Sequence, residues 1–366
     1  MFVLLLCVLS FTRNTIVYLS NTLFNKSDRR LQHSRTINEN KPSEGTMDGQ
    51  TQDNKKLQKL DEIDTIPTFS ENNQSYDADY VVKPTVYVKS VVGKDDMNYN
   101  MNHKKRGRCV IFNNDKFEMQ GYEREGSEMD VIAITRVFRD ILGFEVIPHR
   151  NFTSSMIHQA IKKLSEDDYE EEDCLCVFIL THGSHGDSLH AHDCTYPLKS
   201  IWEKFTGDNC HALVGKPKLF FIQCAEVKIS SYPNTACRGT KYDSGIGVFS
   251  SGNSQTDSVA TTASYKIPTH ADILLAHSTV EVLFSPQDFY SWRNETEGSF
   301  YIQELCDVIE EYWETYDLAK MLTITARIVA NEHYSIHIDP KKNQKKQMPS
   351  ITSTLTRDVW FTKKNS

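Results

Sequence analysis

The sequence predicts an α/β domain with a mostly parallel central sheet flanked by helices. After Arg108, short apolar runs typical of strands buried on both faces alternate with segments of helical period. Strands that alternate with helices are characteristic of parallel sheets. Residues 25–102 are instead rich in Asn, Ser, Thr, Asp and Lys. We expect this stretch to be mostly disordered, because it offers too little apolar surface to offset the entropy of ordering it.

Five apolar runs are the expected strands of this sheet, and a later alternating run adds a sheet edge. The runs are 109–112, 144–147, 174–180, 219–222 and 273–277. The alternating run, 350–361, has strand character, and as an exposed edge it must be covered or paired. Pairing of this edge with a second copy of the chain would give a dimer.

Helices are expected between and after these strands. In 129–142 apolar residues recur at three- and four-residue spacing, and Gly143 follows as a stop. The other expected helices are 154–164, 298–313 and 317–330. The segment 243–265 consists largely of Ser, Gly, Thr and Asn, so we expect a flexible connector that proteases can reach.

Composition limits the functional class. The net charge is -8, which argues against a general nucleic-acid binder. Nine cysteines without regular spacing, several of them inside apolar strands, favour reduced thiols and therefore the cytoplasm. Residues 1–11 are apolar enough for the core of a signal peptide, so a signal or anchor role for residues 1–24 stays open.

Two expected strands end in chemically reactive residues. The run 174–180 leads into Thr181-His182-Gly183, and 219–222 leads to Cys224 and later to Cys237. The carboxyl ends of parallel strands meet at one edge of a sheet. A histidine can there take the proton of a thiol that attacks a carbonyl, while a backbone N–H holds the oxyanion. Alternatively, His182 caps a strand and the cysteine is an ordinary core thiol.

Several longer motifs add to these residues. They are GKPKLFFIQ and then ACRG, with His-Gly upstream and Tyr-Ser-Trp-Arg-Asn at 290–294 downstream. In this order, over about 106–361, the chain resembles the caspases, cysteine proteases that cut after aspartate. It is most similar to effector caspases with a short prosegment. The resemblance implies a three-layer sandwich built from a large and a small subunit of one chain, and a role in apoptosis.

The resemblance also implies roles for individual residues. Cys237 would be the nucleophile and His182 the proton shuttle, with the N–H groups of Gly183 and Cys237 as oxyanion hole. Arg124, Arg293 and Gln223 would bind the substrate aspartate, because a guanidinium pairs a carboxylate with two hydrogen bonds. The residues implied for the neighbouring subsites are Tyr290, Ser291, Trp292 and Asn294.

Maturation by proteolysis is a further implication. Residues 1–105 would be a prosegment removed after Asp64, and cleavage after Asp257 would separate the large subunit, 106–257, from the small one, 258–366. The implied partners are protein substrates with aspartate before the scissile bond, an upstream activating protease, inhibitor proteins, and a second copy in a homodimer. No cofactor, metal or nucleic acid is expected.

Two insertions set this chain apart from the family pattern. Residues 224–235 separate Gln223 from Ala-Cys-Arg-Gly, which follow Gln directly in the family, and 282–288 lengthen a loop before Tyr290. Because small displacements of a nucleophile cost much rate, a weak or inactive member that binds proteases or substrates is an alternative. Cys224 is an alternative thiol, since it follows Gln223 directly.

Metal binding is an alternative from another class. Four His residues and one Cys crowd into the thirteen residues that begin with the His-Gly motif, but they lack a Cys-x-x-Cys or His-x3-His pair. The residues concerned are His182, His185, His190, His192 and Cys194.

Overall fold

A computed structural model describes most of the chain after residue 86. The described residues are 87–90, 93–118, 123–184, 187–226, 246–250, 264–279, 293–294, 296–335 and 343–364. All of them belong to one compact unit, 80–366.

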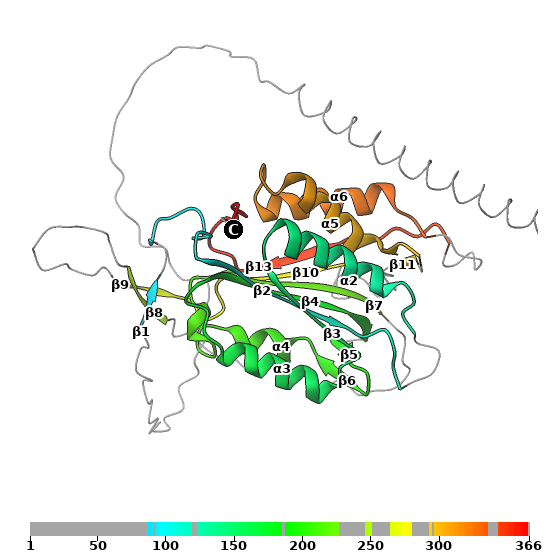
Figure 1. Cartoon of the computed structure of the whole chain (residues 1–366), viewed down its shortest axis with the longest axis horizontal. Helices are drawn as coiled ribbons and strands as arrows, with labels where there is room; N and C mark the ends of the chain where they lie inside the picture. Colours follow the sequence, from blue (N-terminus) through cyan, green and yellow to red (C-terminus); the bar gives the residue numbers. More distant parts are fainter. Residues whose placement is uncertain are drawn as a thin grey trace, which may run out of the picture. The chain divides into compact units, whose positions relative to one another are not determined.

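An eight-stranded sheet forms the centre of this unit (Figure 1). Six strands follow the order β13-β10-β7-β4-β2-β3, and the short β5 and β6 extend from β4. Neighbours in the main order run parallel except β13, which is antiparallel to β10. The strands are β2 (Lys105–Asn113), β3 (Glu145–Arg150), β4 (Glu172–Ser184), β5 (Ser188–His190), β6 (Thr195–Pro197), β7 (Lys218–Glu226), β10 (Ile273–His277) and β13 (Ser350–Ser353).

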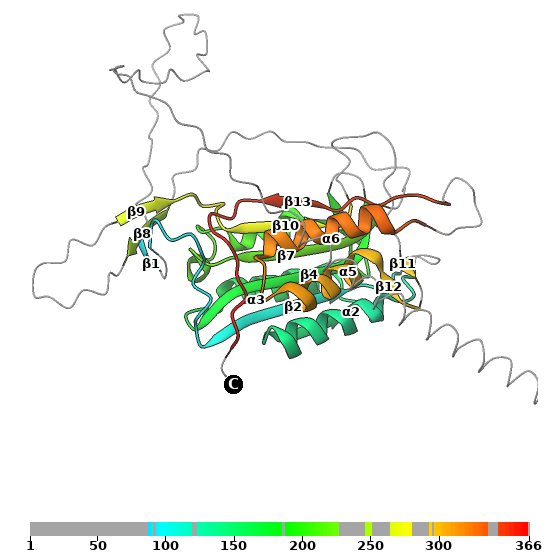
Figure 2. The same cartoon turned by 90° about the horizontal axis from the view of Figure 1, so that it is seen from above.

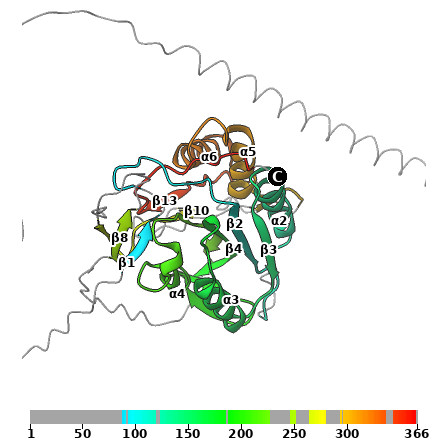
Figure 3. The ribbon, with the colours of Figure 1, turned by 60° about the vertical axis from the view of Figure 1, so that its left-hand side comes forward.

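Helices cover both faces of the sheet, which gives three layers (Figure 3). One face, here called the α5 face, carries α2, α5 and α6, and the other, the α3 face, carries α3 and α4. Each face has its own apolar cluster, with Phe221 of β7 in the first and Phe220 in the second. The helices are α2 (Ser127–Thr135), α3 (Ser154–Glu166), α4 (Lys199–Trp202), α5 (Phe300–Tyr312) and α6 (Leu318–Glu332), with single 3-10 turns at Glu203–Phe205 and His211–Leu213. The predicted fold class is confirmed.

The five predicted strands are confirmed, and four of them are longer than their apolar runs. Two of these extensions lie at the carboxyl ends of β4 and β7. β4 continues past 180 to Ser184, and β7 continues past 222 to Glu226. The extra residues pair with each other, His182 with Ala225 and Gly183 with Glu226. Mutual pairing satisfies their backbone groups, so apolar side chains are not needed there.

The helix predicted over 129–142 begins at Ser127 and changes character near its end. Residues Arg136–Ile141 form a π-helical turn, in which the N–H of Leu142 donates to the carbonyl of Val137. Gly143 has φ 79°, the left-handed conformation that ends helices, so the predicted stop is confirmed.

The C-terminal run departs from its predicted strand. Only Ser350–Ser353 form β13, at the sheet edge, whereas Val359 and Phe361 are buried in the cluster of the α5 face. The backbone of Asp358 bonds instead to Met97 and Tyr99. Figure 2 shows this segment running from β13 past the ends of the strands.

The N-terminal extension was predicted to be disordered up to about 102, and this is wrong for its last residues. Tyr99 and Met101 are buried in the core, and β2 begins at Lys105. Tyr99 donates a hydrogen bond to Asp272 from its hydroxyl, 2.7 Å away. The burial of Tyr99 and Met101 was not predicted, because the few apolar residues of this stretch pack against partners far along the chain.

The connector predicted over 243–265 also contains secondary structure. Strands β8 (Ile246–Ser250) and β9 (Ser264–Ile267) pair antiparallel, and β1 (Tyr87–Ser90) joins β8 in parallel. Residues 251–263, with the predicted cleavage site Asp257, lie outside the described residues, as does Asp64.

A buried charge cluster joins the amino ends of β2 and β4. The guanidinium of Arg106 donates to Asp173, 2.8 Å away, and to the carbonyls of Leu142 and Thr362. Lys364 places its ammonium 2.5 Å from the same carboxylate. Both Arg106 and Asp173 are fully buried, so each needs the other's charge.

Strands β2 and β4 approach each other so closely at Gly107 that a larger residue does not fit there. Its φ is +123°, and a Cβ there would lie 1.9 Å from the carbonyl oxygen of Cys174. Gly143 also has a positive φ, but a Cβ there would meet only the Lys364 side chain at 3.7 Å. We expect Gly143→Ala to lower the free energy of unfolding by about 1–2 kcal/mol, and Gly107→Ala by at least about 3 kcal/mol. Urea unfolding of both variants is the measurement, and equal losses would contradict the prediction.

Candidate active site

The paired ends of β4 and β7 form the centre of the site. In the parallel register Leu180 lies opposite Gln223, and His182 lies opposite Ala225. Side chains alternate along a strand. Because Phe178, Leu180 and Phe221 belong to the cluster of the α5 face, His182 and Gln223 face that side as well. The carboxyl ends of the strands therefore present an imidazole and an amide on one face.

Aromatic and hydroxyl contacts hold the end of β4. The His182 ring, half-buried, lies 5.2 Å from the ring of Phe117, centroid to centroid. The Thr181 hydroxyl donates to the carbonyl of His190, 2.6 Å away, and the Nε2 atom of His190 lies 2.7 Å from the Ser184 hydroxyl. Gly183 is buried and pairs with Leu189 of β5. The small β5–β6 hairpin thus fixes the His-Gly segment.

Arg124 lies buried beside the end of β2. Its Nη1 atom donates to the carbonyl of Asn114, 3.2 Å away, and lies 3.4 Å from Oδ1 of Asn113. Asn113 pairs with Leu180, which pairs with Gln223, so these three residues form a row across β2, β4 and β7. Strands are about 4.8 Å apart. The fold therefore brings Arg124 and Gln223, 2 % exposed each, to the same face as His182.

Strand β11 (Arg293–Asn294) pairs with β12 (Gly298–Ser299). It carries Arg293, predicted for the aspartate pocket, and Asn294, predicted for a neighbouring subsite. The Asn294 side chain stabilises this hairpin. Its Oδ1 atom accepts hydrogen bonds from the backbone and hydroxyl of Thr296, and its amide donates to Glu297. The Asn294 side chain thus closes a turn, and its predicted contact with a bound peptide stays a prediction.

Asp130 was missed by the sequence analysis. It is fully buried on α2 and accepts hydrogen bonds from Ser299 and Gln303. Burial raises the pKa of this carboxyl, while the hydrogen bonds and the charge of Arg124 oppose the rise. The signal that could have found it is an acidic residue next to Val131 in the apolar stripe of the helix, a place where charges are rare unless paired.

The alternative nucleophile Cys224 faces the other way. Its half-buried side chain packs against the cluster of the α3 face. Residues adjacent along a strand point to opposite faces, and Cys224 pairs with Thr181, not with His182. This arrangement argues against Cys224 as partner of the imidazole.

The remaining predicted residues lie outside the described part of the chain. They are Cys237, Tyr290, Ser291 and Trp292, together with 227–235 of the first insertion and the second insertion, 282–288.

The predicted metal alternative gains no support from the described residues. His192 binds the carbonyl of Lys116 through Nδ1, 2.8 Å away, and His190 contacts Ser184. Among the residues described, no three His, Cys, Asp or Glu side chains stand close enough together to hold an ion.

In the same part of the chain, no helix has the length and apolar character needed to cross a bilayer.

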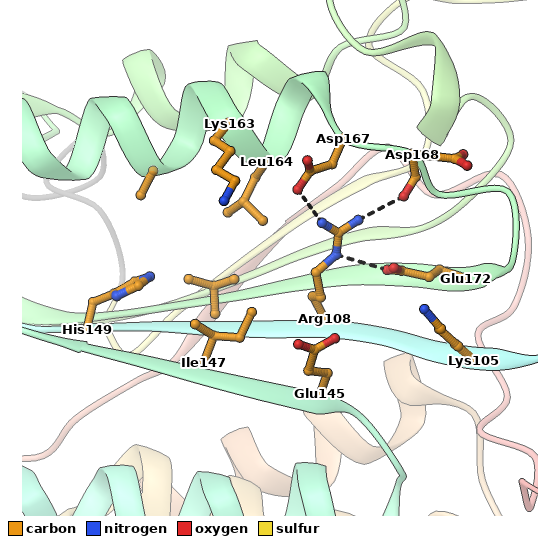
Figure 4. Close-up of a pocket in the computed structure, with 12 residues that line it drawn as sticks. Lys105, Arg108, Glu145, Ile147, His149, Lys163, Leu164, Asp167, Asp168 and Glu172 are labelled. Carbon is orange, nitrogen blue, oxygen red and sulfur yellow. Dashed lines mark hydrogen bonds and ion pairs between the residues drawn. The ribbon is translucent and has the colours of Figure 1, made fainter.

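A separate cavity of about 510 Å³ lies between β2, β3 and α3 (Figure 4). Arg108 crosses it and binds Asp167, Glu172 and the carbonyl of Asp168. The guanidinium is thus already saturated by acidic neighbours. Because α3 covers this face of the sheet, the cavity is on the opposite side from His182 and Gln223.

Comparison with known proteins assigns the family. The Caspase domain family matches residues 106–360. Caspase-1 of Spodoptera frugiperda is 38% identical over 286 residues, covering 78% of this chain and 88% of the relative. Caspase drICE of Drosophila melanogaster is 38% identical over 278 residues, covering 75% and 76%.

The solved structure of caspase-1 from Spodoptera frugiperda matches with a TM-score of 0.62 at 35% identity, covering 75% of this chain and 98% of that one. The site described above lies within residues 106–360, the range that the Caspase domain family matches. The chain therefore belongs to the caspase family of aspartate-specific cysteine endopeptidases.

Proposed function

We propose that this chain is the zymogen of an endopeptidase that acts in apoptosis, cuts after aspartate, and uses His182 and Cys237 as its catalytic pair. The observation that carries the proposal is the row of Asn113, Leu180 and Gln223, beside buried Arg124 and on the same face as His182. A buried guanidinium favours a carboxylate ligand, because the carboxylate supplies both charge and two acceptors.

The reaction follows from the roles of these groups. The Cys237 sulfur attacks the backbone carbonyl carbon of the substrate aspartate, while His182 accepts the thiol proton. The N–H groups of Gly183 and Cys237 stabilise the oxyanion. His182 then passes the proton to the leaving amine as the peptide C–N bond breaks, which leaves the aspartyl carbonyl bound to the Cys237 sulfur as a thioester. Water hydrolyses this thioester to a carboxylic acid and restores the thiol. Arg124, Arg293 and Gln223 hold the aspartate, and Tyr290, Ser291 and Trp292 line the adjoining subsites.

Processing and assembly belong to the same proposal. An upstream protease would cut after Asp64 and Asp257 in the cytoplasm, and inhibitor proteins would block the groove. The large and small subunits would dimerise through β13, which is the last strand of the sheet and exposes Ile351 by 41%. An apolar edge strand is stabilised when a second copy pairs with it.

A specific observation favours the second candidate function, a member that binds aspartyl peptides without cutting them. In the family order Gln-Ala-Cys, the nucleophile is the second residue after Gln. Here that position is Ala225, and it is the register partner of His182. Paired residues face the same side on strands about 4.8 Å apart, so a thiol at this register position would reach the imidazole. Because the chain has alanine there, the position holds no nucleophile.

The identity of the nucleophile is tested by two serine substitutions. We expect Cys237→Ser to abolish hydrolysis of peptides with aspartate before the scissile bond, because an alcohol is a much weaker nucleophile than a thiolate. The matched variant Cys224→Ser should retain most turnover, since Cys224 faces the α3 side. Turnover that survives Cys237→Ser but not Cys224→Ser would refute the assignment.

Deleting 224–235 tests whether the insertion limits activity. The deletion places Ala236 opposite Thr181 and Cys237 opposite His182 in the observed register. We expect kcat to rise at least about tenfold, because a strand then fixes the nucleophile and placement errors of about 1 Å cost on the order of a hundredfold. Equal turnover for both chains would show that the insertion does not displace Cys237.

A single substitution examines the same register without shortening the chain. In the Cys237→Ser background, Ala225→Cys should create aspartate-specific hydrolysis, since it puts a thiol at the register position opposite His182. Ala225→Ser is the control and should remain inactive. An inactive Ala225→Cys chain of unchanged melting temperature would mean that the described register is not the one used in catalysis.

The proposed dimer is tested by light scattering of the processed protein. We expect Ile351→Lys to shift dimer towards monomer at micromolar concentration, because a charge on an edge strand opposes pairing. Met156→Lys is the control, since Met156 is 43% exposed but lies on α3, away from β13. An unchanged dimer in the Ile351 variant would locate the interface elsewhere.

A further inference from the structure

Asp130 is a buried carboxylate with three hydrogen-bond donors. Its Oδ1 atom accepts from the backbone N–H of Ser299 at 2.7 Å and from the amide of Gln303 at 2.9 Å. Its Oδ2 atom accepts from the Ser299 hydroxyl at 2.6 Å. The residue is 0% exposed, so these bonds replace all of its hydration. The carboxylate therefore holds Ser299 firmly against α2.

These bonds connect α2 to the β11–β12 hairpin. Asp130 and Ser299 are 169 positions apart in the chain. Ser299 is the register partner of Arg293. The preceding Gly298 has φ +94°, and a Cβ there would lie 2.5 Å from Oδ1 of Asp130. A glycine is thus required for the hairpin to approach the carboxylate this closely.

On its other side Asp130 is coupled to Arg124. The N–H of Ser127, the first residue of α2, donates to the carbonyl of Arg124, so the arginine leads directly into the helix. The positive charge of Arg124 also acts on the Asp130 carboxyl. Asp130 thus bonds the Arg293 hairpin to the helix that begins directly after the Arg124 turn.

We propose that Asp130 is a positioning residue that sets the spacing between the Arg124 segment and the Arg293 hairpin, and thereby the selectivity for aspartate. This inference rests on the proposed function of the two arginines. Bidentate pairing of a carboxylate needs both guanidinium groups in a defined geometry, and the two come from opposite ends of the domain sequence. A shared anchor supplies that geometry before substrate binds.

Peptide binding tests the inference without catalysis. The probe is an acetylated, amidated peptide of residues 61–66, and its partner carries Asp64→Asn. Calorimetry in the Cys237→Ser background gives the ratio of the two affinities. We expect Asp130→Ala to lower the preference for the aspartyl peptide at least about tenfold, because the hairpin loses its anchor.

Three further variants separate the positioning effect of Asp130 from the effect of its negative charge and from a general loss of folding. Asp130→Asn has nearly the same shape, keeps an oxygen for Ser299 N–H and Gln303, and can donate to the Ser299 hydroxyl, so it should restore most of the preference. Ser299→Ala removes the hydroxyl contact alone and should cause a smaller loss. Asp140→Ala removes an acidic residue whose side chain is 51% exposed at the end of the same helical segment, and should change nothing.

The outcomes distinguish this inference from the function on which it rests. If the unsubstituted pocket does not prefer the aspartyl peptide, the proposed function is overturned together with the inference. If it does prefer it and folded Asp130→Ala or Ser299→Ala keeps the same ratio, the inference alone is overturned. A loss in Asp130→Asn as large as that in Asp130→Ala would show that charge, not position, is what matters.

Discussion

The parallel pairing of β4 and β7 is the constraint on which the site depends. Its register places Gln223 beside Leu180 and continues past the apolar core to Gly183 and Glu226. A shift of one residue would send Gln223 to the α3 face and away from His182. The register in the buried part of these two strands thus sets which residues lie opposite each other at their carboxyl ends. An insertion placed directly after Gln223 matters more than one of equal length in a surface loop for this reason.

Two groups of buried charges, at opposite ends of the strands, have different tasks. At the amino ends of the strands, Arg106 and Asp173 neutralise each other and attach the C-terminal tail through Lys364. At the carboxyl ends, Arg124 lies among carbonyl and amide acceptors, and Asp130 bonds to Ser299. The first group is closed and structural. The second contains the guanidinium that we propose as a ligand of the substrate aspartate.

Much of the fold could be predicted because its signals are local. Strands buried on both faces can be recognised in the sequence as apolar runs. Gly143 ends its helix because few other residues adopt a positive φ without a cost in free energy. The polar ends of β4 and β7, the strands β8 and β9, and the burial of Tyr99 could not be predicted. Each depends on a partner distant in sequence, as Tyr99 depends on Asp272. The same holds for Asp130, whose donors lie 169 and 173 positions away.

Short motifs and local periodicity were enough to predict the class of fold, the family resemblance and the residue types of the candidate site. Which side of the sheet each residue faces emerges only in the folded chain. It placed Cys224 on the α3 face and made Ala225 the register partner of His182. The physical reason is that a strand alternates its side chains with a period of two, so facing is set by register between strands, and register is a property of the assembled sheet.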